Sequence, residues 1–224
     1  MSQTTTVMAS ELDGEAQRLA LAEIGQQFHA RTWSVGTSSN YSVVLDRDPL
    51  RLLITASGKD KGNLGIDDFV IVDESGQATT PTQPKPSAET LLHTMIASQL
   101  GAGAVLHTHS VWATLLSDLF AEEGAVMIEG YEMLKGLEGI KTHEHRERIA
   151  IVENSQDMRT LSEELSQRLR EGDETLRYGF ILRRHGLYTW GKDLFAARRH
   201  VEILEFLFEA VGRRLSLSLP STVS

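Results

Sequence analysis

Residues 104–110 read Ala-Val-Leu-His-Thr-His-Ser, and this stretch decides how the rest of the sequence is organised. Its apolar run predicts a short strand over Ala104–His107. A helix is expected on either side of the strand, one beginning near Ser87 and running to about Leu100, and one over Val111–Phe120. Short strands that alternate with helices are typical of an α/β domain.

The same alternation continues toward both ends of the chain. Apolar residues spaced three to four apart predict an amphipathic helix from Ser10 to about Trp33 and a final helix that opens at Asp193. Further strands are expected at 42–46, 51–55, 69–72, 125–128, 149–152, 180–183 and 187–190, and further helices at 132–137 and 158–170. We therefore expect one domain over residues 10–215, between a flexible N-terminus at 1–9 and a flexible tail at 216–224.

The last two strands are expected to form a tight hairpin. The segments Phe180–Arg183 and Leu187–Trp190 flank the pair His185-Gly186. Glycine tolerates a positive φ, which such turns favour, so the pattern predicts a turn that carries His185 at a strand end.

The composition excludes several classes of function. The 224 residues include no cysteine, so disulfides, iron–sulfur clusters, thiolate nucleophiles and cysteine-bound zinc are absent, and any metal must be held by His, Asp or Glu. A net charge of −9 opposes binding to nucleic acid or to an anionic membrane surface. The segment Met1–Glu15 lacks the features of a signal peptide, and no apolar run approaches the roughly 20 residues that span a bilayer. We expect a cytoplasmic protein.

The pair His107 and His109 is the strongest chemical signal. Side chains two residues apart in a strand point to the same face, so the two imidazoles converge on one point, as in a metal chelate. A catalytic zinc site takes three protein ligands and leaves one position open, and the candidate third ligand is His185. The alternative is that the pair merely caps the end of a strand. A second pair, His143 and His145, lies in the charged stretch 141–148 and is expected to be a solvated loop.

The remaining histidines are expected to be ordinary surface or core-edge residues of helices: His29, His93 and His200.

Three segments rich in small polar residues are candidate phosphate cradles: 36–40, 55–59 and 85–87. Gly/Ser turns and helix N-termini present free N–H groups to an anion. Each segment alone is equally typical of a turn or a helix cap. Together, and without a P-loop or a dinucleotide fingerprint, they favour a small phosphorylated molecule over a nucleotide.

The roles of two carboxylates, Glu89 and Glu132, remain open. Glu89 lies in the first turn after Ser87, where stabilisation by the helix dipole is the favoured explanation when this residue is taken alone. Glu132 lies on a short predicted helix and is also compatible with an exposed surface position. Spacing along the sequence brings neither of them to the metal.

Five motifs in succession resemble the class II aldolase and adducin-type family: GTSSN at 36–40, TASGKDKG at 55–62, KPSAET at 85–90, AVLHTHS at 104–110 and RRHGLYTWG at 183–191. The resemblance runs from about Leu12 to Leu215. It implies a three-layer α/β/α fold with a central, largely antiparallel sheet, so that residues 10–215 form a class II aldolase-like catalytic domain. It also implies a ring-shaped homotetramer with sites near the subunit boundaries.

The same resemblance implies roles for individual residues. His107, His109 and His185 match the three ligands of one zinc ion per subunit. Glu132 matches the acid/base of the family's dehydratases, and Glu89 matches the carboxylate that serves zinc or acts as base in its aldolases. Four residues fall where relatives hold the substrate phosphate: Asn40, Ser57, Gly58 and Ser87.

The segments 130–136 and 151–157 most resemble the family members that remove water from a methylthio-substituted ketose phosphate in methionine salvage. The resemblance therefore implies a hydro-lyase acting on a small phosphorylated ketose. Two alternatives stay open, an aldolase or 4-epimerase acting on another ketose phosphate, and a non-catalytic adducin-like binding module. The complete histidine set argues against the latter.

Overall fold

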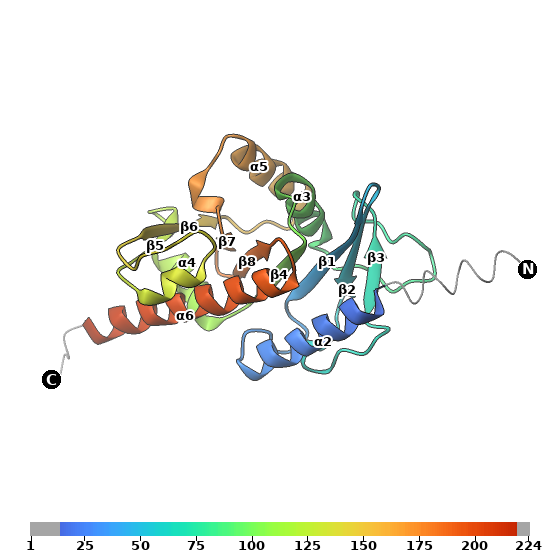
Figure 1. Cartoon of the computed structure of the whole chain (residues 1–224), viewed down its shortest axis with the longest axis horizontal. Helices are drawn as coiled ribbons and strands as arrows, with labels where there is room; N and C mark the ends of the chain where they lie inside the picture. Colours follow the sequence, from blue (N-terminus) through green and yellow to red (C-terminus); the bar gives the residue numbers. More distant parts are fainter. Residues whose placement is uncertain (1–13, 219–224) are drawn as a thin grey trace, which may run out of the picture.

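A computed structural model describes residues 14–218, which fold around one eight-stranded sheet (Figure 1). Its spatial order is β3-β2-β1-β4-β8-β7-β6-β5. The strands are β1 Asn40–Arg47, β2 Leu50–Thr55, β3 Phe69–Val72, β4 Ala104–Thr108, β5 Ala125–Glu129, β6 Arg146–Val152, β7 Gly179–Leu182 and β8 Gly186–Gly191.

The sheet is largely antiparallel, as expected. Every neighbouring pair of strands is antiparallel except β6 and β7, which run parallel. In the central part of the sheet, Asn40 of β1 pairs with His107 of β4, and His107 pairs with Tyr188 of β8. Paired residues point to the same face of a sheet, so these three side chains lie together on one face.

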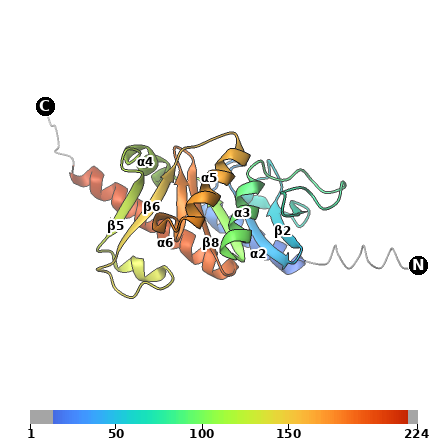
Figure 2. The same cartoon turned by 90° about the horizontal axis from the view of Figure 1, so that it is seen from above.

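Helices cover both faces of the sheet. On one face lie α2 (Glu15–Ala30), α4 (Val111–Leu119) and α6 (Leu194–Ser218), and on the other α3 (Thr90–Leu100) and α5 (Met158–Arg170). In Figure 2, α3 and α5 overlie the middle of the sheet and α6 runs behind it. Three short 3₁₀ turns complete the elements: η1 (Lys61–Asn63), η2 (Glu132–Gly136) and η3 (Glu174–Leu176).

The alternation of β4 explains this layering. Leu106 is buried against Phe28 of α2 and Val201 of α6, whereas Val105 is buried among residues of α3 and α5 on the opposite face. Successive residues of a strand point to opposite faces, so a strand that is apolar throughout is buried on both sides. The three-layer α/β/α architecture follows.

Several boundaries differ from the expected ones. The first helix begins at Glu15, and its expected start at Ser10 lies outside the described residues, as do the segments 1–13 and 219–224. The expected helix at 132–137 is a 3₁₀ turn. The last helix continues to Ser218. Across residues 14–218, no helix combines the length and apolar character needed to cross a membrane.

Candidate active site

Three histidines converge at one end of the sheet. His107 lies in β4, His109 follows that strand, and His185 lies in the turn between β7 and β8. Nε2 of His107 lies 2.8 Å from Nε2 of His109 and 3.3 Å from Nε2 of His185. Within residues 14–218, they are the one group of metal-ligating side chains whose donor atoms all lie within 4.8 Å of one another. The structure thus brings together the three histidines that the sequence singled out.

Hydrogen bonds on the outer side of two rings orient this triad. Nδ1 of His107 lies 2.9 Å from the carbonyl oxygen of Leu187, and Nδ1 of His185 lies 3.3 Å from Oδ1 of Asn154. An oxygen acceptor at Nδ1 places the proton there, so Nε2 presents a lone pair to the centre of the triad. Lone pairs that face one another repel, and a cation between them removes the repulsion. The donor set therefore fits a divalent ion that prefers imidazole, such as zinc.

Burial keeps the triad in the form that binds a metal. His107 is fully buried and stacks on Tyr188, with ring centroids 3.9 Å apart. Burial, followed by the neighbouring imidazoles, holds the pKa of His107 well below its ordinary value. Burial, followed by the nearby His185 and Lys61, lowers the pKa of His109 to about 4. Both rings are neutral at physiological pH, so a metal ion does not have to displace protons from them.

A close approach of two strands brings His185 to the triad. A Cβ added to Gly186 would lie 2.0 Å from the carbonyl oxygen of Thr108, so only glycine allows β8 to reach β4 at this point. The expectation of a positive φ at Gly186 is wrong, because the left-handed residue of the turn is Arg184, with φ 53°. The glycine is required for contact between strands rather than for the turn itself.

Glu89 lies beside the triad, although sequence spacing gave no reason to expect it there. It is the residue that precedes α3, and its side chain is 15% exposed. Its Oε1 lies 3.3 Å from Nε2 of His185, and its Oε2 lies 3.6 Å from Nε2 of His107. The Asn40 amide donates to Oε2 at 2.6 Å. A carboxylate held in this position can serve as a further oxygen ligand or as a base.

His93 is a site residue that the sequence analysis missed. It was expected at the surface or the core edge, yet it is fully buried behind Asn40. Its Nε2 hydrogen-bonds to Oδ1 of Asn40, and its Nδ1 lies 2.7 Å from Oγ of Ser42. Because an amide oxygen only accepts, Nε2 carries the proton, and the NH₂ group of Asn40 must point toward Glu89. Burial lowers the pKa of His93 to about 3, so the ring stays neutral.

His200 is also more buried than expected, because α6 presses it against the sheet. It is 4% exposed, and its Nδ1 lies 2.8 Å from the carbonyl oxygen of Trp190. By contrast, His29 is at the surface as expected. His143 and His145 lie outside the triad, the former exposed and the latter paired with Glu147 at 2.9 Å.

A pocket of about 410 Å³ opens beside the triad. Residues of all three candidate phosphate cradles line it, and it also takes in the loop that leads into α5. The lining residues are Thr37, Ser38, Ser39, Asn40, Ala56, Ser57, Gly58, Lys61, Ser87, Ala88, Glu89, His109, Asn154, Gln156, Met158 and His185. Its size suits a small metabolite, and the four residues matched to a phosphate site are all among them.

Ser87 does not cap α3 as expected. The residue that precedes the helix is Glu89, and Ser87 forms a turn before it, with its carbonyl oxygen accepting from the Thr90 amide at 3.2 Å. The Oγ atom of Ser87 accepts a hydrogen bond from the side-chain NH₂ group of Asn40 at 3.2 Å. The same Oγ also accepts from the backbone N–H of Glu89 at 3.3 Å, so Ser87 closes the turn two residues before the position that precedes the helix, and it lines the pocket.

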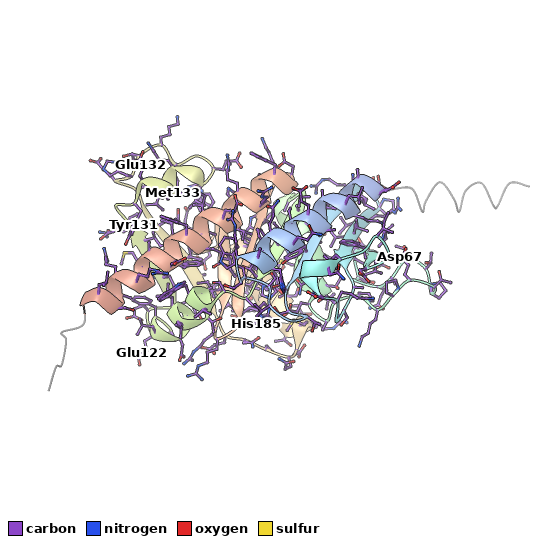
Figure 3. All side chains as sticks on the ribbon, turned by 90° about the horizontal axis from the view of Figure 1, so that it is seen from below. Asp67, Glu122, Tyr131, Glu132, Met133 and His185 are labelled. Atoms are coloured by element: carbon purple, nitrogen blue, oxygen red, sulfur yellow. The ribbon has the colours of Figure 1, made fainter. Side chains whose placement is uncertain are left out.

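Glu132 is not brought to the triad of its own chain. Its side chain is 68% exposed on η2, where it pairs with Lys135 and lies 3.7 Å from His143. The hydrogen bond from Lys135 is the main cause that lowers its pKa. In Figure 3, Glu132 and His185 lie on opposite sides of the long helix α6.

The sequence and the fold were compared with known proteins. The model of the class II aldolase and adducin N-terminal domain matches residues 19–211, and the chain belongs to this family. Two solved structures have the same fold: a putative aldolase/epimerase/decarboxylase from Escherichia coli (TM-score 0.73, 23% identity, 88% of this chain and 89% of that chain) and l-fuculose-1-phosphate aldolase from Thermus thermophilus (TM-score 0.68, 22% identity, 92% and 99%).

Relatives of higher identity share one name. A methylthioribulose-1-phosphate dehydratase from Picosynechococcus sp. is 41% identical over 211 residues, which cover 93% of this chain and 97% of that protein. A protein of the same name from Pseudomonas aeruginosa is 45% identical over 201 residues, with 88% and 94% covered.

Proposed function

We propose that this chain is a zinc-dependent methylthioribulose-1-phosphate dehydratase of methionine salvage, with residues 10–215 as its catalytic domain and the cytoplasm as its location. The reaction removes water from 5-methylthioribulose 1-phosphate and gives 2,3-diketo-5-methylthiopentyl 1-phosphate. The observation that carries the proposal is the convergence of His107, His109, His185 and Glu89 on a pocket lined by the phosphate-cradle segments. The shared name of the relatives supports the choice of substrate.

The three histidines would hold one zinc ion per subunit. When bound there, zinc supplies Lewis-acid polarisation of the substrate's ketone oxygen, which acidifies the neighbouring C–H bond. Asn40 keeps the Glu89 carboxylate next to this position. Ser57, Gly58 and Ser87 are the proposed donors to the phosphate on C1, the carbon next to the ketone. Asn40 is the fourth residue of this proposed site, and its NH₂ group also donates to Ser87 and Glu89.

The chain's carboxylates carry the proton transfers. A base removes the proton from C3, the electron pair of that C–H bond forms the C3–C4 double bond, and the C4 hydroxyl leaves as water once it receives a proton. The resulting enol gives the diketone when C4 gains a proton and the C3 hydroxyl loses its proton. An aldolase would instead remove the proton of the C4 hydroxyl and break the C3–C4 bond, so the position of the base decides the product.

We assign Glu132 as the acid/base and Glu89 as a second candidate. Because Glu132 is exposed and separated from its own triad, the assignment requires that it acts in the site of a neighbouring subunit. Such an arrangement agrees with the homotetramer that the family resemblance implies. Replacing Glu132 by Gln should slow turnover at least about a hundredfold while zinc content is retained.

A surface suited to subunit contact begins next to the triad. Helix α4 starts two residues after His109, and one of its faces exposes Val111, Leu115 and Leu119 at 63%, 54% and 62%. Residues four apart on a helix form a continuous stripe. Apolar stripes of this kind mark surfaces that are covered by a partner, and a second copy of the chain fits the proposal.

The test is to supply the zinc-loaded protein with methylthioribulose 1-phosphate, and in parallel with fuculose 1-phosphate and ribulose 5-phosphate. We expect loss of water from the first and no turnover of the others. Release of two carbon fragments would assign an aldolase, inversion at C4 an epimerase, and inertness toward all three substrates would contradict an enzymatic role of this kind.

A further inference from the structure

Lys61 is a buried cation without a carboxylate partner. Its side chain lies on η1 and is 1% exposed. Its Nζ donates to the carbonyl oxygen of Lys59 at 2.7 Å and to that of Thr37 at 3.3 Å. No Asp or Glu of residues 14–218 lies within ion-pair distance of it. An ammonium group has three protons, so the two carbonyl oxygens leave one donor available.

The environment opposes this charge. Burial lowers the pKa of Lys61 to about 8, against the more distant carboxylates of Asp60 and Asp68, which raise it. A lysine is rarely fully buried unless it has a partner, because desolvation of the ammonium costs free energy. An anion that is not part of the chain and binds next to Lys61 would compensate this cost.

Helix α2 packs closely against η1 and holds Lys61 in place. A Cβ on Gly25 of α2 would lie 2.4 Å from the carbonyl oxygen of Lys61, and a Cβ on Gly62 would lie 2.7 Å from the ring of His29. Two glycines thus allow η1 to press directly on α2. This close packing fixes the backbone of Lys61, so the side chain cannot move out toward solvent.

The lysine lies where two of the phosphate-cradle loops meet. The carbonyl groups that it contacts belong to Thr37 in one loop and Lys59 in the other, and Lys61 itself lines the pocket beside Ser57 and Gly58. It is the one lysine or arginine among the pocket residues, which also include the Glu89 carboxylate. Lys59, two residues earlier, is turned outward and pairs with Asp68 at 2.7 Å.

We propose that the Lys61 ammonium is the cationic contact for the phosphate of the substrate, and that it makes the pocket specific for phosphorylated over unphosphorylated ketoses. The proposal rests on the proposed function, because it concerns the phosphate end of the same pocket. A phosphate carries a charge of about −1.5 to −2 at neutral pH. Neutral hydroxyl and amide donors leave that charge uncompensated, whereas a charge-assisted hydrogen bond in a partly buried site is about twice as strong as a neutral one.

The experiment compares two lysines of the same segment. Zinc-loaded wild-type, Lys61→Met, Lys61→Gln and Lys59→Met proteins are titrated with inorganic phosphate by calorimetry, after zinc content and melting temperature have been measured. Loss of a hydrogen bond to a charged group should weaken phosphate binding roughly 10- to 100-fold in both Lys61 variants. Lys59→Met should bind within about twofold of wild type, because Lys59 faces Asp68.

A measurement on the unaltered side chain covers the case in which the Lys61 variants do not fold. In protein with carbon-13-labelled lysine, saturating phosphate should shift the Cε signal of Lys61 and leave that of Lys59 in place. Phosphate binding that survives in a folded Lys61→Met protein would overturn the proposal, and so would an unshifted Lys61 signal at saturation. Dehydration of methylthioribulose 1-phosphate by the wild type tests the proposed function separately, since either result can fail without the other.

Discussion

At the scale of single residues, the candidate site depends on how side chains from separate elements meet. A His-x-His pair after an apolar run places two imidazoles on one face by the geometry of the strand alone. The contact between Glu89 and the triad depends on where α3 begins relative to β4, which no local pattern encodes. Likewise, the sequence does not distinguish Lys59 from Lys61. Only the packing of η1 on α2 buries Lys61.

The first prediction concerns the metal. His185→Ala should lose zinc, because only two imidazoles remain and a catalytic site takes three protein ligands. The control is His143→Ala, which changes an exposed histidine outside the triad and should keep one zinc per chain. Metal analysis of the two purified proteins measures the difference. Full zinc occupancy in His185→Ala would contradict the three-histidine assignment.

The second prediction concerns Glu205 of α6, which is 2% exposed and whose carboxyl group accepts a hydrogen bond from Thr108 of β4 at 2.5 Å. Burial raises its pKa from 4.5 to about 7. In the folded state the group therefore keeps its proton up to about pH 7, whereas in the unfolded state it loses the proton near pH 4.5. The free energy of unfolding falls as pH rises through this window, by at most about 3 kcal/mol.

Glu205→Gln removes this titration, since glutamine resembles the protonated acid and stays neutral. Its melting temperature relative to wild type should rise between pH 5 and pH 8 and level off above that. Thermal unfolding of both proteins over this range is the measurement. A constant difference across the range would show that Glu205 is already ionised in the fold.

At the scale of elements, most strands and helices were predictable from periodicity, including β3 and α5, whose ends agree with the expected residues. The hairpin was expected for the wrong reason. The pattern predicts Gly186 as a turn residue, yet the glycine is needed because β8 passes so close to Thr108. Close approaches between strands that are 78 residues apart leave no local trace beyond the glycine itself.

The third prediction follows from this contact. Gly186→Ala places a Cβ 2.0 Å from the carbonyl oxygen of Thr108, so β8 must move away from β4 and take His185 with it. Zinc affinity should fall at least about tenfold, and the melting temperature should fall as well. Gly65→Ala is the control, because its nearest neighbour would be 3.6 Å away. Metal competition with a chelator measures the affinity of both variants.

At the scale of the whole molecule, the α/β fold was predictable, while the location of Glu132 relative to the histidine triad was not. Glu132 matches a family motif, but the topology carries η2 to the side of α6 away from the triad. Under the proposed assignment, a single chain holds two parts of a reaction centre that do not meet. Only an assembly of several chains can join them, and a sequence pattern contains no information on how copies are arranged.

The fourth prediction tests that assembly. Glu132→Gln and His185→Ala should each be inactive alone, and mixed oligomers of the two should regain activity where an intact triad meets an intact Glu132 from its neighbour. For a random equal mixture, about one quarter of the sites of a ring are restored. Turnover is measured after the two proteins are unfolded and refolded together. Mixed oligomers that stay inactive would place Glu132 outside the neighbouring site.

The triad and the pocket wall are built from different kinds of structure. The three histidines project from β4, from the residue that follows it and from the turn between β7 and β8, while loop residues 37–39, 56–58, 154 and 156 contribute much of the wall. A reaction centre on a rigid frame with exchangeable loops around it is a modular design, open to engineering. Exchanging residues 155–157 while keeping Asn154 is a route to accepting ketose phosphates with other side chains, because Asn154 supports His185 of the triad.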